Sequence, residues 1–483
     1  MNRMTFGIPV LFLACSCFSS LLGQSMGPLT VHPDNPRYFT NDGKQAVYLT
    51  GSHTWAGLHE RGYAGVTPDF DYPGYLDFLE ANNHNFIRLW AWEQAHWMQF
   101  TPEKIRYTPL RYQRTGPGLA LDGYPKFDVT QFEQYFFDRL RNRVRAAQDR
   151  GIYVMVMLFQ GFSVHQKGSF GPPSEKNNGN NWAGHPFNRA NNINGIDGDP
   201  DNDDRGREVH SLQIPEITKI QERFVRKVID TLNDLDNVLW EIGNECDNLS
   251  TEWQYHLIRL IQDYEATKPK QHPVAMTFQY GAGDRRGTNA ALFNSPAEAI
   301  SPAMEDGQNY QHDPPVADGS KVILSDTDHH GGLWGTVEWV WKSFLRGHYP
   351  IMMDAYTDVR RSSWSVRLEG GPPDAYWNGA RLAMGDTRRF AERVHLADMT
   401  PRNELASSGY CLANPGIEYL VLVPGEDTVT LDLTTETGTF TVEWYLIHGR
   451  RLLDKTRTLQ GGEIATLKSL KGEDAVVYIF KKN

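Results

Sequence analysis

The sequence predicts an α/β protein in which a closed (β/α)8 barrel is followed by a small antiparallel β-sandwich. Three observations support this prediction. Eight short apolar runs occur within residues 47–354, helix-like segments separate several of them, and alternating strands without helices fill the last part of the chain. Parallel strands that are buried on both faces and alternate with helices are typical of α/β folds, and eight such strands favour closure into a barrel.

The eight apolar runs are the expected barrel strands. In chain order they are AVYLTGSHTW, NFIRLWAWE, IYVMVMLF, NVLWEIGNE, PVAMTF, AEAISP, KVILSDTDHH and YPIMMDAY. Apolar residues at helical spacing predict helices within 132–144, 217–228 and 253–264. An open doubly wound sheet is the alternative, but no Gly-rich phosphate loop follows the first run. The barrel is therefore the favoured fold for residues 25–400.

The C-terminal residues 401–483 have a different pattern of apolar and polar residues. Stretches such as GIEYLVLVPG and TFTVEWYLIHG alternate apolar and polar residues, and Gly, Asp and Asn separate them. This pattern predicts a β-sandwich domain with a core of its own.

Composition limits the partners and the location of the protein. The net charge of -11 argues against nucleic acid and anionic membranes as partners. Residues 1–24 combine a weakly basic start with an apolar run too short to span a membrane, which predicts a signal peptide and export to the periplasm or beyond. Lipid attachment at Cys15 is an alternative that Phe12 disfavours.

Acidic residues end two of the predicted strands. Glu245 follows the fourth run, and Asp326 and Asp328 end the seventh. The carboxyl ends of barrel strands meet at one mouth, where active sites are built. Glycoside hydrolysis needs two carboxyl groups on either side of the bond that is cleaved. The sequence therefore predicts a glycosidase (EC 3.2.1.-) that acts on a polysaccharide or an oligosaccharide.

Four stretches carry a family resemblance, namely DNVLWEIGNE, DTDHHGG, VWKSFLRGHYPIMMDAY and LANPGIEYLVLVPG. With these stretches the sequence resembles the clan A retaining glycoside hydrolases, which include family 5 cellulases and mannanases. It is also similar to apiosidase-like proteins, whose barrel precedes a module labelled collagen-binding. The resemblance extends over nearly the whole chain after the signal peptide.

The resemblance implies a role for several residues. Glu245 is the implied general acid/base, Asn244 holds a substrate hydroxyl, and Arg88 keeps the nucleophile ionised, as a nearby cation does. The clan has Glu on the seventh strand, whereas this chain offers Asp326 or Asp328. Alignment of KVILSD favours Asp326 and a retaining mechanism; inversion with Asp328 as the base is the alternative. Glu241 is expected to be a structural partner of Arg88 or of a histidine.

Other residues at the strand ends are expected to bind the substrate. They are His53, Trp55, Trp90, Trp92, His329 and His330. Aromatic faces suit sugar rings, so at least one tryptophan is expected to stack on sugar while the others belong to the core. Because the histidines lack a metal-ligand spacing such as HExxH, we expect hydrogen-bonding roles and no metal or other cofactor.

Two connections are too long for simple turns, from Gln94 to Lys126 and from Gln160 to Pro215, and the second contains an acidic stretch, DGDPDNDDRGRE. It places Asp197, Asp199, Asp201 and Glu208 at the oxygen spacing of a calcium loop, but Asn202 stands at the sixth position, where such loops have glycine. A solvated acidic loop is the favoured interpretation, and calcium binding is the alternative.

A second function competes with hydrolysis. The barrel could be a non-catalytic scaffold that binds carbohydrate, with the C-terminal module in contact with a matrix polymer. The aspartates at the place of the clan's glutamate keep this alternative open.

Overall fold

The computed structural model describes residues 27–63, 70–97, 105–165, 181–281, 285–305, 307–354, 356, 374–425, 427–453, 457–469 and 472–481. The predicted signal peptide and Cys15 lie outside these residues. Within the described ranges, no helix has both the length and the apolar character needed to cross a membrane.

Eight parallel strands form one sheet, in the order β3-β15-β14-β13-β12-β11-β10-β5. Seven of them lie within a predicted run, and β10 extends one residue beyond its run. The strands are β3 (Gly51–His53), β5 (Phe86–Leu89), β10 (Tyr153–Gln160), β11 (Val238–Asn244), β12 (Val274–Thr277), β13 (Ala299–Ser301), β14 (Val322–Asp326) and β15 (Tyr349–Met353). The end strands β3 and β5 meet, since the Asn85 N–H donates to the Thr50 carbonyl oxygen at 3.0 Å. The predicted (β/α)8 barrel is confirmed.

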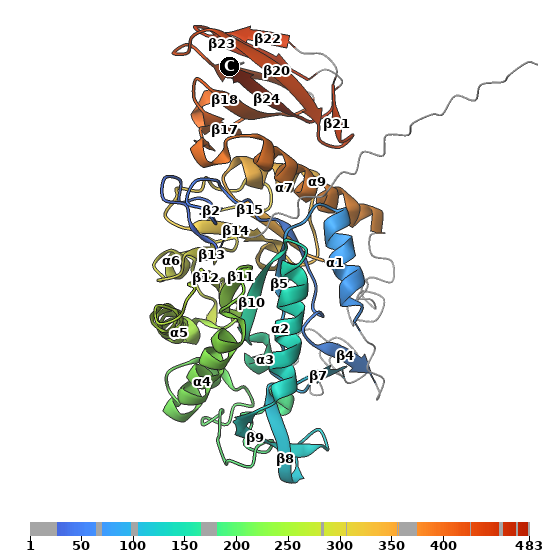
Figure 1. The fold of residues 1–483 in the computed structure, drawn as a ribbon, viewed down its shortest axis with the longest axis vertical. Coiled ribbons are helices and arrows are strands. Elements are labelled where there is room, and N and C mark those ends of the chain that lie inside the picture. The colour runs from blue at the N-terminus through green and yellow to red at the C-terminus, as the bar shows by residue number, and fades with distance from the viewer. Residues whose placement is uncertain are drawn as a thin grey trace, which may run out of the picture.

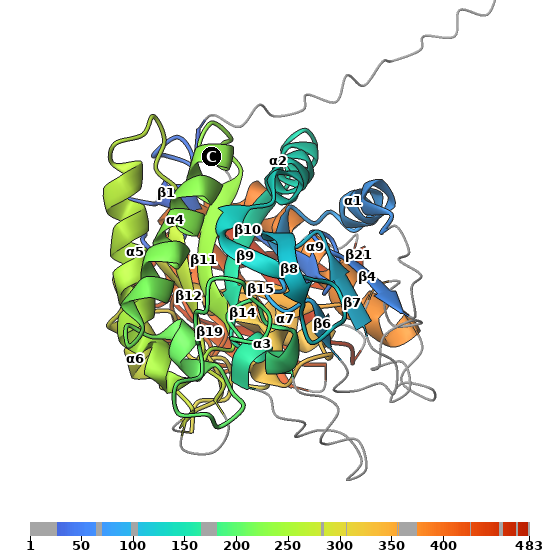
Figure 2. The ribbon, with the colours of Figure 1, turned by 90° about the horizontal axis from the view of Figure 1, so that it is seen from below.

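Helices surround this sheet. They are α1 (Tyr72–Ala81), α2 (Gln134–Gln148), α4 (Pro215–Leu232), α5 (Thr251–Glu265), α6 (Asn289–Phe293), α7 (Val337–Leu345) and α9 (Asp374–Arg393). Figure 2 shows α2, α4 and α5 on the outside of β10, β11 and β12. The apolar stripe predicted on α4 is buried against the barrel, as at Phe224 and Val228. Amphipathic helices that cover parallel strands explain why both faces of the strands are apolar.

The connections at the mouth carry extra structure that the sequence did not predict as strands. β4 (Glu60–Tyr63), β6 (His96–Trp97) and β7 (Ile105–Thr108) form a small antiparallel sheet, and β8 (Tyr112–Leu119) pairs with β9 (Pro125–Phe132). The second long connection contains the short helices α3 (Phe162–His165), η1 (Asn181–Gly184) and η2 (Arg207–His210). In Figure 1 the β8–β9 hairpin lies at the opposite end of the molecule from the C-terminal strands.

The C-terminal part is an antiparallel sandwich, as predicted. One sheet has seven strands: β16 (Thr400–Pro401), β17 (Cys411–Asn414), β18 (Glu418–Val423), β20 (Thr439–Leu446), β21 (Arg451–Leu452), β22 (Arg457–Gln460) and β24 (Ala475–Lys481). The other pairs β19 (Thr428–Asp432) with β23 (Ile464–Lys468). Near the N-terminus, β1 (Thr30–Val31) pairs with β2 (Phe39–Thr40).

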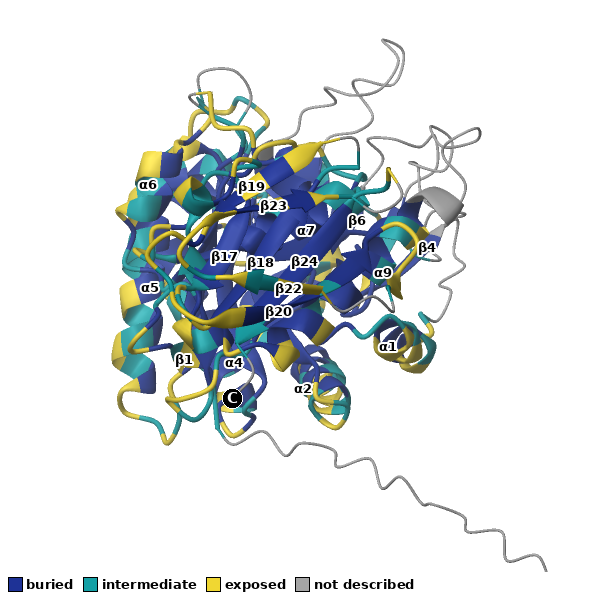
Figure 3. Ribbon diagram, turned by 90° about the horizontal axis from the view of Figure 1, so that it is seen from above, coloured by how far each residue is buried: buried dark blue, intermediate teal, exposed yellow. Residues whose placement is uncertain are grey.

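Both faces of the central strands of the larger C-terminal sheet are buried. On β18, Tyr419 and Val421 face the core of the sandwich, whereas Leu420 and Leu422 join a core that includes Trp341 of α7. Alternate strand residues point to opposite faces, so the run EYLVLV fills two cores at once. Figure 3, coloured by burial, shows β18 and β24 as buried strands over α7.

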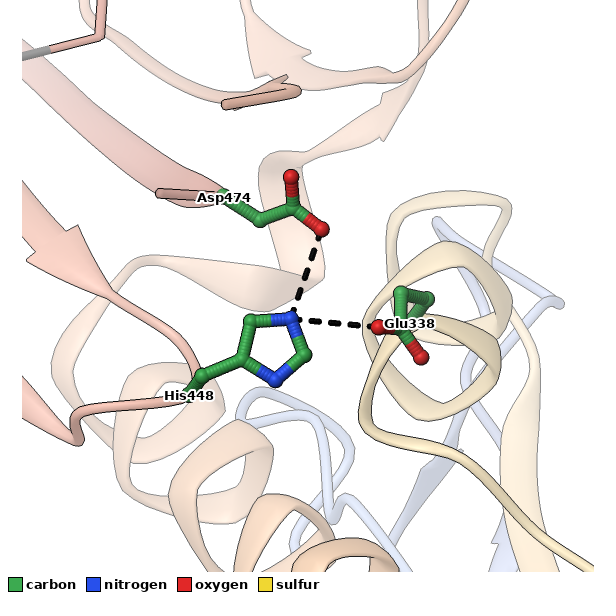
Figure 4. A group of neighbouring side chains, drawn as sticks. All are labelled: Glu338, His448 and Asp474. Atoms are coloured by element: carbon green, nitrogen blue, oxygen red, sulfur yellow. Dashed lines mark hydrogen bonds and ion pairs between the residues drawn. The ribbon is translucent and has the colours of Figure 1, made fainter. Parts of the chain in front are cut away.

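A polar contact also joins the two parts of the chain. Nε2 of His448, after β20, lies 3.1 Å from Oε1 of Glu338 on α7 and 3.4 Å from Oδ2 of Asp474, as Figure 4 shows. The barrel and the sandwich are thus connected by an apolar core and by this triad at its edge.

Candidate active site

A buried arginine lies at the centre of the candidate site. Arg88 on β5 is 1% exposed, and its guanidinium donates from Nε and Nη2 to Glu241 on β11, at 2.7 and 2.5 Å. Burial opposes its charge, but the carboxylates of Glu241, Asp326 and Asp328 raise the pKa of Arg88 above its usual range. The bidentate pair confirms Glu241 as a structural partner of Arg88 and fixes the guanidinium.

The same guanidinium reaches the seventh strand and the residue before Glu245. Its Nη1 donates to Asp328 Oδ2 at 2.8 Å and lies 3.4 Å from Asp326 Oδ2, and its Nη2 donates to Asn244 Oδ1 at 2.5 Å. One cation therefore links β5, β11 and β14, and brings Asn244 close to both predicted aspartates.

Asp326 ends β14, and both of its oxygens are in use. Oδ1 accepts from His53 Nε2 and from the Asp328 N–H, each at 3.0 Å, and Oδ2 faces Arg88. The Trp90 indole donates to His53 Nδ1 at 2.7 Å, so Nε2 is the His53 nitrogen that donates to Asp326. Burial alone would raise the pKa of Asp326, but His53 and Arg88 hold it well below its usual range.

The carboxylate of Asp328 accepts fewer hydrogen bonds than that of Asp326. It lies in η5 (Thr327–His330), where Oδ2 accepts from Arg88, while Oδ1 has no hydrogen-bond donor among the described residues. Burial raises the pKa of Asp328; Arg88 opposes this shift and the charge of Asp326 adds to it. Of the two aspartates, Asp328 has the oxygen available for a substrate.

Glu245 follows β11 in a left-handed backbone conformation, with φ of 45°. This region is costly for residues other than glycine, at ~1–3 kcal/mol, and is enriched at functional sites. The turn is tight because Gly161 packs so closely that a Cβ on it would lie 2.3 Å from the Cys246 Cα. Burial, and then the charge of Asp328, raise the pKa of Glu245 to about 8, while Arg88 opposes this shift. Glu245 is therefore protonated at neutral pH, although its side chain is only half-buried.

Asn244 and His329 complete the network. His329 Nε2 lies 3.3 Å from Asn244 Oδ1 and 3.7 Å from Asp328 Oδ2, and its Nδ1 lies 2.7 Å from the Ser301 hydroxyl. Burial and the neighbouring Arg88 hold the pKa of His329 well below its usual range, so the ring is neutral. With Ser301 donating to Nδ1, Nε2 carries the proton and serves as a donor between the two oxygens.

The substrate-binding roles of His330 and the tryptophans stay predictions, and the structure gives the contacts of each with its protein neighbours. The His330 ring stacks on Tyr310, with centroids 5.1 Å apart, and its Nε2 lies 3.2 Å from the Ser325 hydroxyl. His330 thus makes its contacts outside the Arg88 network. The three tryptophans are buried: Trp90 packs on His53 and under Arg88, Trp92 stacks on Tyr107, and the Trp92 indole donates to the Trp55 carbonyl oxygen at 2.9 Å.

Tyr280 is a residue of the site that the sequence prediction missed. Its hydroxyl donates to the His329 carbonyl oxygen at 2.9 Å. Burial raises the pKa of Tyr280 to about 12; Arg286 opposes this shift, and the charges of Glu245 and Asp328 add to it. Tyr280 therefore contacts the chain next to Asp328 and lies within electrostatic range of both carboxyl groups. It follows β12 by three residues, and its position past a strand end was the signal available in the sequence.

A second buried cluster supports the wall of the mouth. Glu93 Oε1 accepts from the Gln160 N–H at 2.7 Å and from His210 Nε2 at 2.8 Å, and Oε2 faces Arg111 and His185 at 3.5 Å. Burial alone would raise the pKa of Glu93, but His210 and Arg111 hold it well below its usual range. Glu93 is therefore a fixed carboxylate that anchors η2 beside the end of β10.

Comparisons with known proteins agree with this architecture. A family described as "Domain of unknown function (DUF6298)" matches residues 104–284. A glycoside hydrolase family 5 structure from Bacteroides vulgatus ATCC 8482 is 12% identical, with a TM-score of 0.56 over 94% of each chain. A structure described as a glycoside hydrolase is 11% identical, with a TM-score of 0.54 over 95% of this chain and 98% of the other. Among curated proteins, none matches the sequence. The chain thus shares its fold with glycoside hydrolases at low identity.

Proposed function

We propose that the protein is a glycoside hydrolase in which Glu245 is the general acid/base and Asp328 is the second carboxylate. The observation that carries this proposal is that burial and the charge of Asp328 raise the pKa of Glu245 to about 8, while Asp328 itself accepts a hydrogen bond from Arg88. The similarity in fold to family 5 structures supports it. Export through residues 1–24 would bring the enzyme to a polysaccharide or oligosaccharide outside the cytoplasm.

Asp328 is preferred to Asp326 because its geometry leaves an oxygen for chemistry. Both carboxylate oxygens of Asp326 are already engaged, by His53, Arg88 and the Asp328 N–H. Asp326 therefore acts as a positioning residue. Asp328 is oriented by Arg88 through one oxygen. The contact with the guanidinium favours the ionised form that a nucleophile needs.

In the proposed first step, Glu245 donates its proton to the glycosidic oxygen while Asp328 attacks the anomeric carbon and forms a glycosyl ester. In the second step, Glu245 takes a proton from water as that water displaces the ester. Retention is the proposed outcome because Asp328 is assigned as the nucleophile, and it requires the two carboxyl groups to lie ~5–5.5 Å apart. His329 Nε2, which lies near Asn244 Oδ1 and Asp328 Oδ2, connects the carboxyl ends of β11 and β14 at this mouth.

The C-terminal sandwich is assigned a structural role in this proposal. One face of its larger sheet forms a common core with α7 and α9, and the other face forms the core of the sandwich. Neither face of its central strands β18 and β24 is thus available for a matrix polymer.

The two aspartates can be separated by substitution. Asp328→Asn is expected to lower turnover of an aryl glycoside by about 10³-fold or more, because the attacking carboxylate is lost. Asp326→Asn is expected to cost less, since it acts through His53 and Arg88. Both variants are to be compared by steady-state kinetics and thermal unfolding, with a panel of aryl glycosides. Wild-type turnover in Asp328→Asn would refute the assignment.

The product anomer gives an independent check in the same assay. NMR of the first-formed sugar should show the retained configuration. An inverted product would instead make Asp328 the base that activates water, with Glu245 still the acid.

The pH profile of kcat/KM is expected to be bell-shaped. Activity should fall as the pH rises past about 8, because Glu245, with its raised pKa, then loses the proton that it must donate. It should also fall on the acid side, where Asp328 takes up a proton, at a pH above the ordinary range of aspartate. Glu245→Gln should remove the alkaline limb for a substrate with a good leaving group. A wild-type profile that stays flat well above pH 8 would contradict Glu245 as the acid.

A further inference from the structure

The side chain of Gln160 lies at the carboxyl end of β10, beside the candidate site. Gln160 and Asn244 are both fully buried, and they are paired residues of the neighbouring strands β10 and β11. Gln160 Oε1 accepts from Asn244 Nδ2 at 3.2 Å and from the Phe162 N–H at 3.1 Å. Gln160 therefore makes direct contact with a residue that binds Arg88.

Groups that only donate hydrogen bonds fix the orientation of both side-chain amides. A backbone N–H and a guanidinium have no acceptor atom. Because the Phe162 N–H points at the Gln160 amide, the amide atom that it meets must be the oxygen. Arg88 Nη2 likewise requires the oxygen of Asn244, and His329 Nε2 approaches that same oxygen at 3.3 Å. The Asn244 nitrogen is then left to face Gln160 Oε1.

Gln160 thereby excludes the opposite orientation of the Asn244 amide. A half-turn of that amide would place its oxygen against Gln160 Oε1 and its nitrogen against the Arg88 guanidinium. Two buried hydrogen bonds would then be replaced by an acceptor facing an acceptor and a donor facing a donor, which is costly where water cannot reach. The orientation of the Asn244 side chain thus depends on the acceptor that Gln160 provides.

The oxygen of Asn244 in turn holds two donors beside Asp328. Arg88 donates from Nη2 to Asn244 Oδ1 at 2.5 Å and from Nη1 to Asp328 Oδ2 at 2.8 Å. His329 Nε2 lies 3.3 Å from the same Asn244 oxygen and 3.7 Å from Asp328 Oδ2. Because both donors lie between Asn244 and Asp328, a displacement of Asn244 Oδ1 would also change the surroundings of the Asp328 carboxylate.

We propose that Gln160 is a positioning residue, which holds the Asn244 amide in one orientation and through it fixes the two donors beside Asp328. This inference rests on the proposed function, in which Asp328 is the second carboxylate. Gln160 is itself held at its backbone, because its N–H donates to Glu93 Oε1 at 2.7 Å. The buried cluster around Glu93 thereby supports the residue that orients Asn244.

The kinetic test uses an aryl glycoside that the wild type hydrolyses. Gln160→Met keeps the length of the side chain but removes the acceptor. It should lower kcat by ~10–100-fold with little change in KM, because the reacting groups are displaced while the binding surface is kept. Asn244→Ala should also lower kcat, and adding Gln160→Met to it should change kcat by less than about twofold, since Gln160 acts through Asn244. A glutamine with a purely structural role would cost the same in both backgrounds.

Gln221→Met is the matched control. Gln221 is also fully buried, and its amide pairs with the Val209 carbonyl oxygen at 2.8 Å and with the Trp253 indole at 2.9 Å, outside the Arg88 network. This substitution also removes buried hydrogen bonds and should lower the free energy of unfolding. Its kcat should nevertheless stay close to that of the wild type.

Nuclear magnetic resonance of the full chain with isotope-labelled asparagine tests the orientation without a substrate. The side-chain signals of Asn244 are identified by their absence from the Asn244→Ala spectrum. In the wild type, one of the two amide hydrogens should lie downfield, as the hydrogen bond to Gln160 requires, and in Gln160→Met it should move upfield. The wild-type spectrum decides even if Gln160→Met fails to fold.

Three results would overturn the proposal. They are wild-type Asn244 signals at the positions of exposed asparagines, wild-type kcat in a folded Gln160→Met, and a further loss of about tenfold or more when Gln160→Met is added to Asn244→Ala. A wild-type protein that hydrolyses no glycoside would overturn the proposed function instead, and the Asn244 signals would then still test its orientation by Gln160.

Discussion

Replacing Glu245 by glutamine is expected to lower turnover of a natural glycan by ~10²–10⁴-fold, because glutamine keeps the shape of the side chain but cannot donate the proton. The left-handed turn at Glu245 and the network around Arg88 should persist, since the side chain is only half-buried and the backbone turn is set by Gly161. The variant should therefore remain folded while its chemistry fails.

The assay compares wild type and Glu245→Gln on plant and algal polysaccharides and on aryl glycosides. A substrate with a good leaving group needs little acid help, so its first chemical step should slow much less. Glu252→Gln is the matched control, because Glu252 is an exposed residue in the first turn of α5. Equal hydrolysis of a natural glycan by wild type and Glu245→Gln would refute the role of Glu245. Binding of glycans without any hydrolysis would favour the carbohydrate-binding alternative.

Arg88→Met is expected to reduce the free energy of unfolding by ~3–5 kcal/mol, because it leaves buried carboxylates without their cation. Glu241 is fully buried and Asp326 nearly so, and both depend on this guanidinium. The loss should be smaller at low pH, where protons can neutralise the carboxylates. Activity should be lost as well, since the guanidinium orients both Asp328 and Asn244.

Chemical denaturation of purified variants measures this effect. Arg141→Met is the control: Arg141 pairs with Asp234 in a partly exposed salt bridge, for which a loss below ~1 kcal/mol is expected. Adding Glu241→Gln to Arg88→Met should restore part of the stability, because one of the unpaired charges is then removed. A loss in Arg88→Met no larger than that in Arg141→Met would show that the buried network does not hold the barrel mouth.

Much of the site could be predicted because its parts stand at the ends of strongly apolar strands. The strands containing Arg88 and Asn244 can be predicted from their local runs of apolar residues. Barrel closure then brings the carboxyl ends of all strands to one mouth. Any barrel built from these eight runs would therefore gather Arg88, Asn244, Glu245 and the two aspartates. The sandwich could also be predicted from local sequence, since apolar and polar residues alternate along its strands and its turns contain Gly, Asp and Asn.

The choice between Asp326 and Asp328 needed the tertiary structure. The two residues are similar in sequence context, and what separates them is His53 from β3, oriented by Trp90 from the chain after β5. His329 and His330 are neighbours in the sequence, yet each residue of a 3₁₀ turn rotates by about 120°, so one contacts Asn244 and the other Tyr310.

What the sequence by itself determined is the set of strands, their order along the chain and the acids at their ends, because these depend on local periodicity. Only the tertiary structure decided which charged side chains lie next to one another. The pairing of Arg88 with Glu241 and the raised pKa of Glu245 both depend on burial and on distances of a few ångströms between distant segments. Coulomb interactions and desolvation vary steeply with such distances, and a sequence pattern does not contain them.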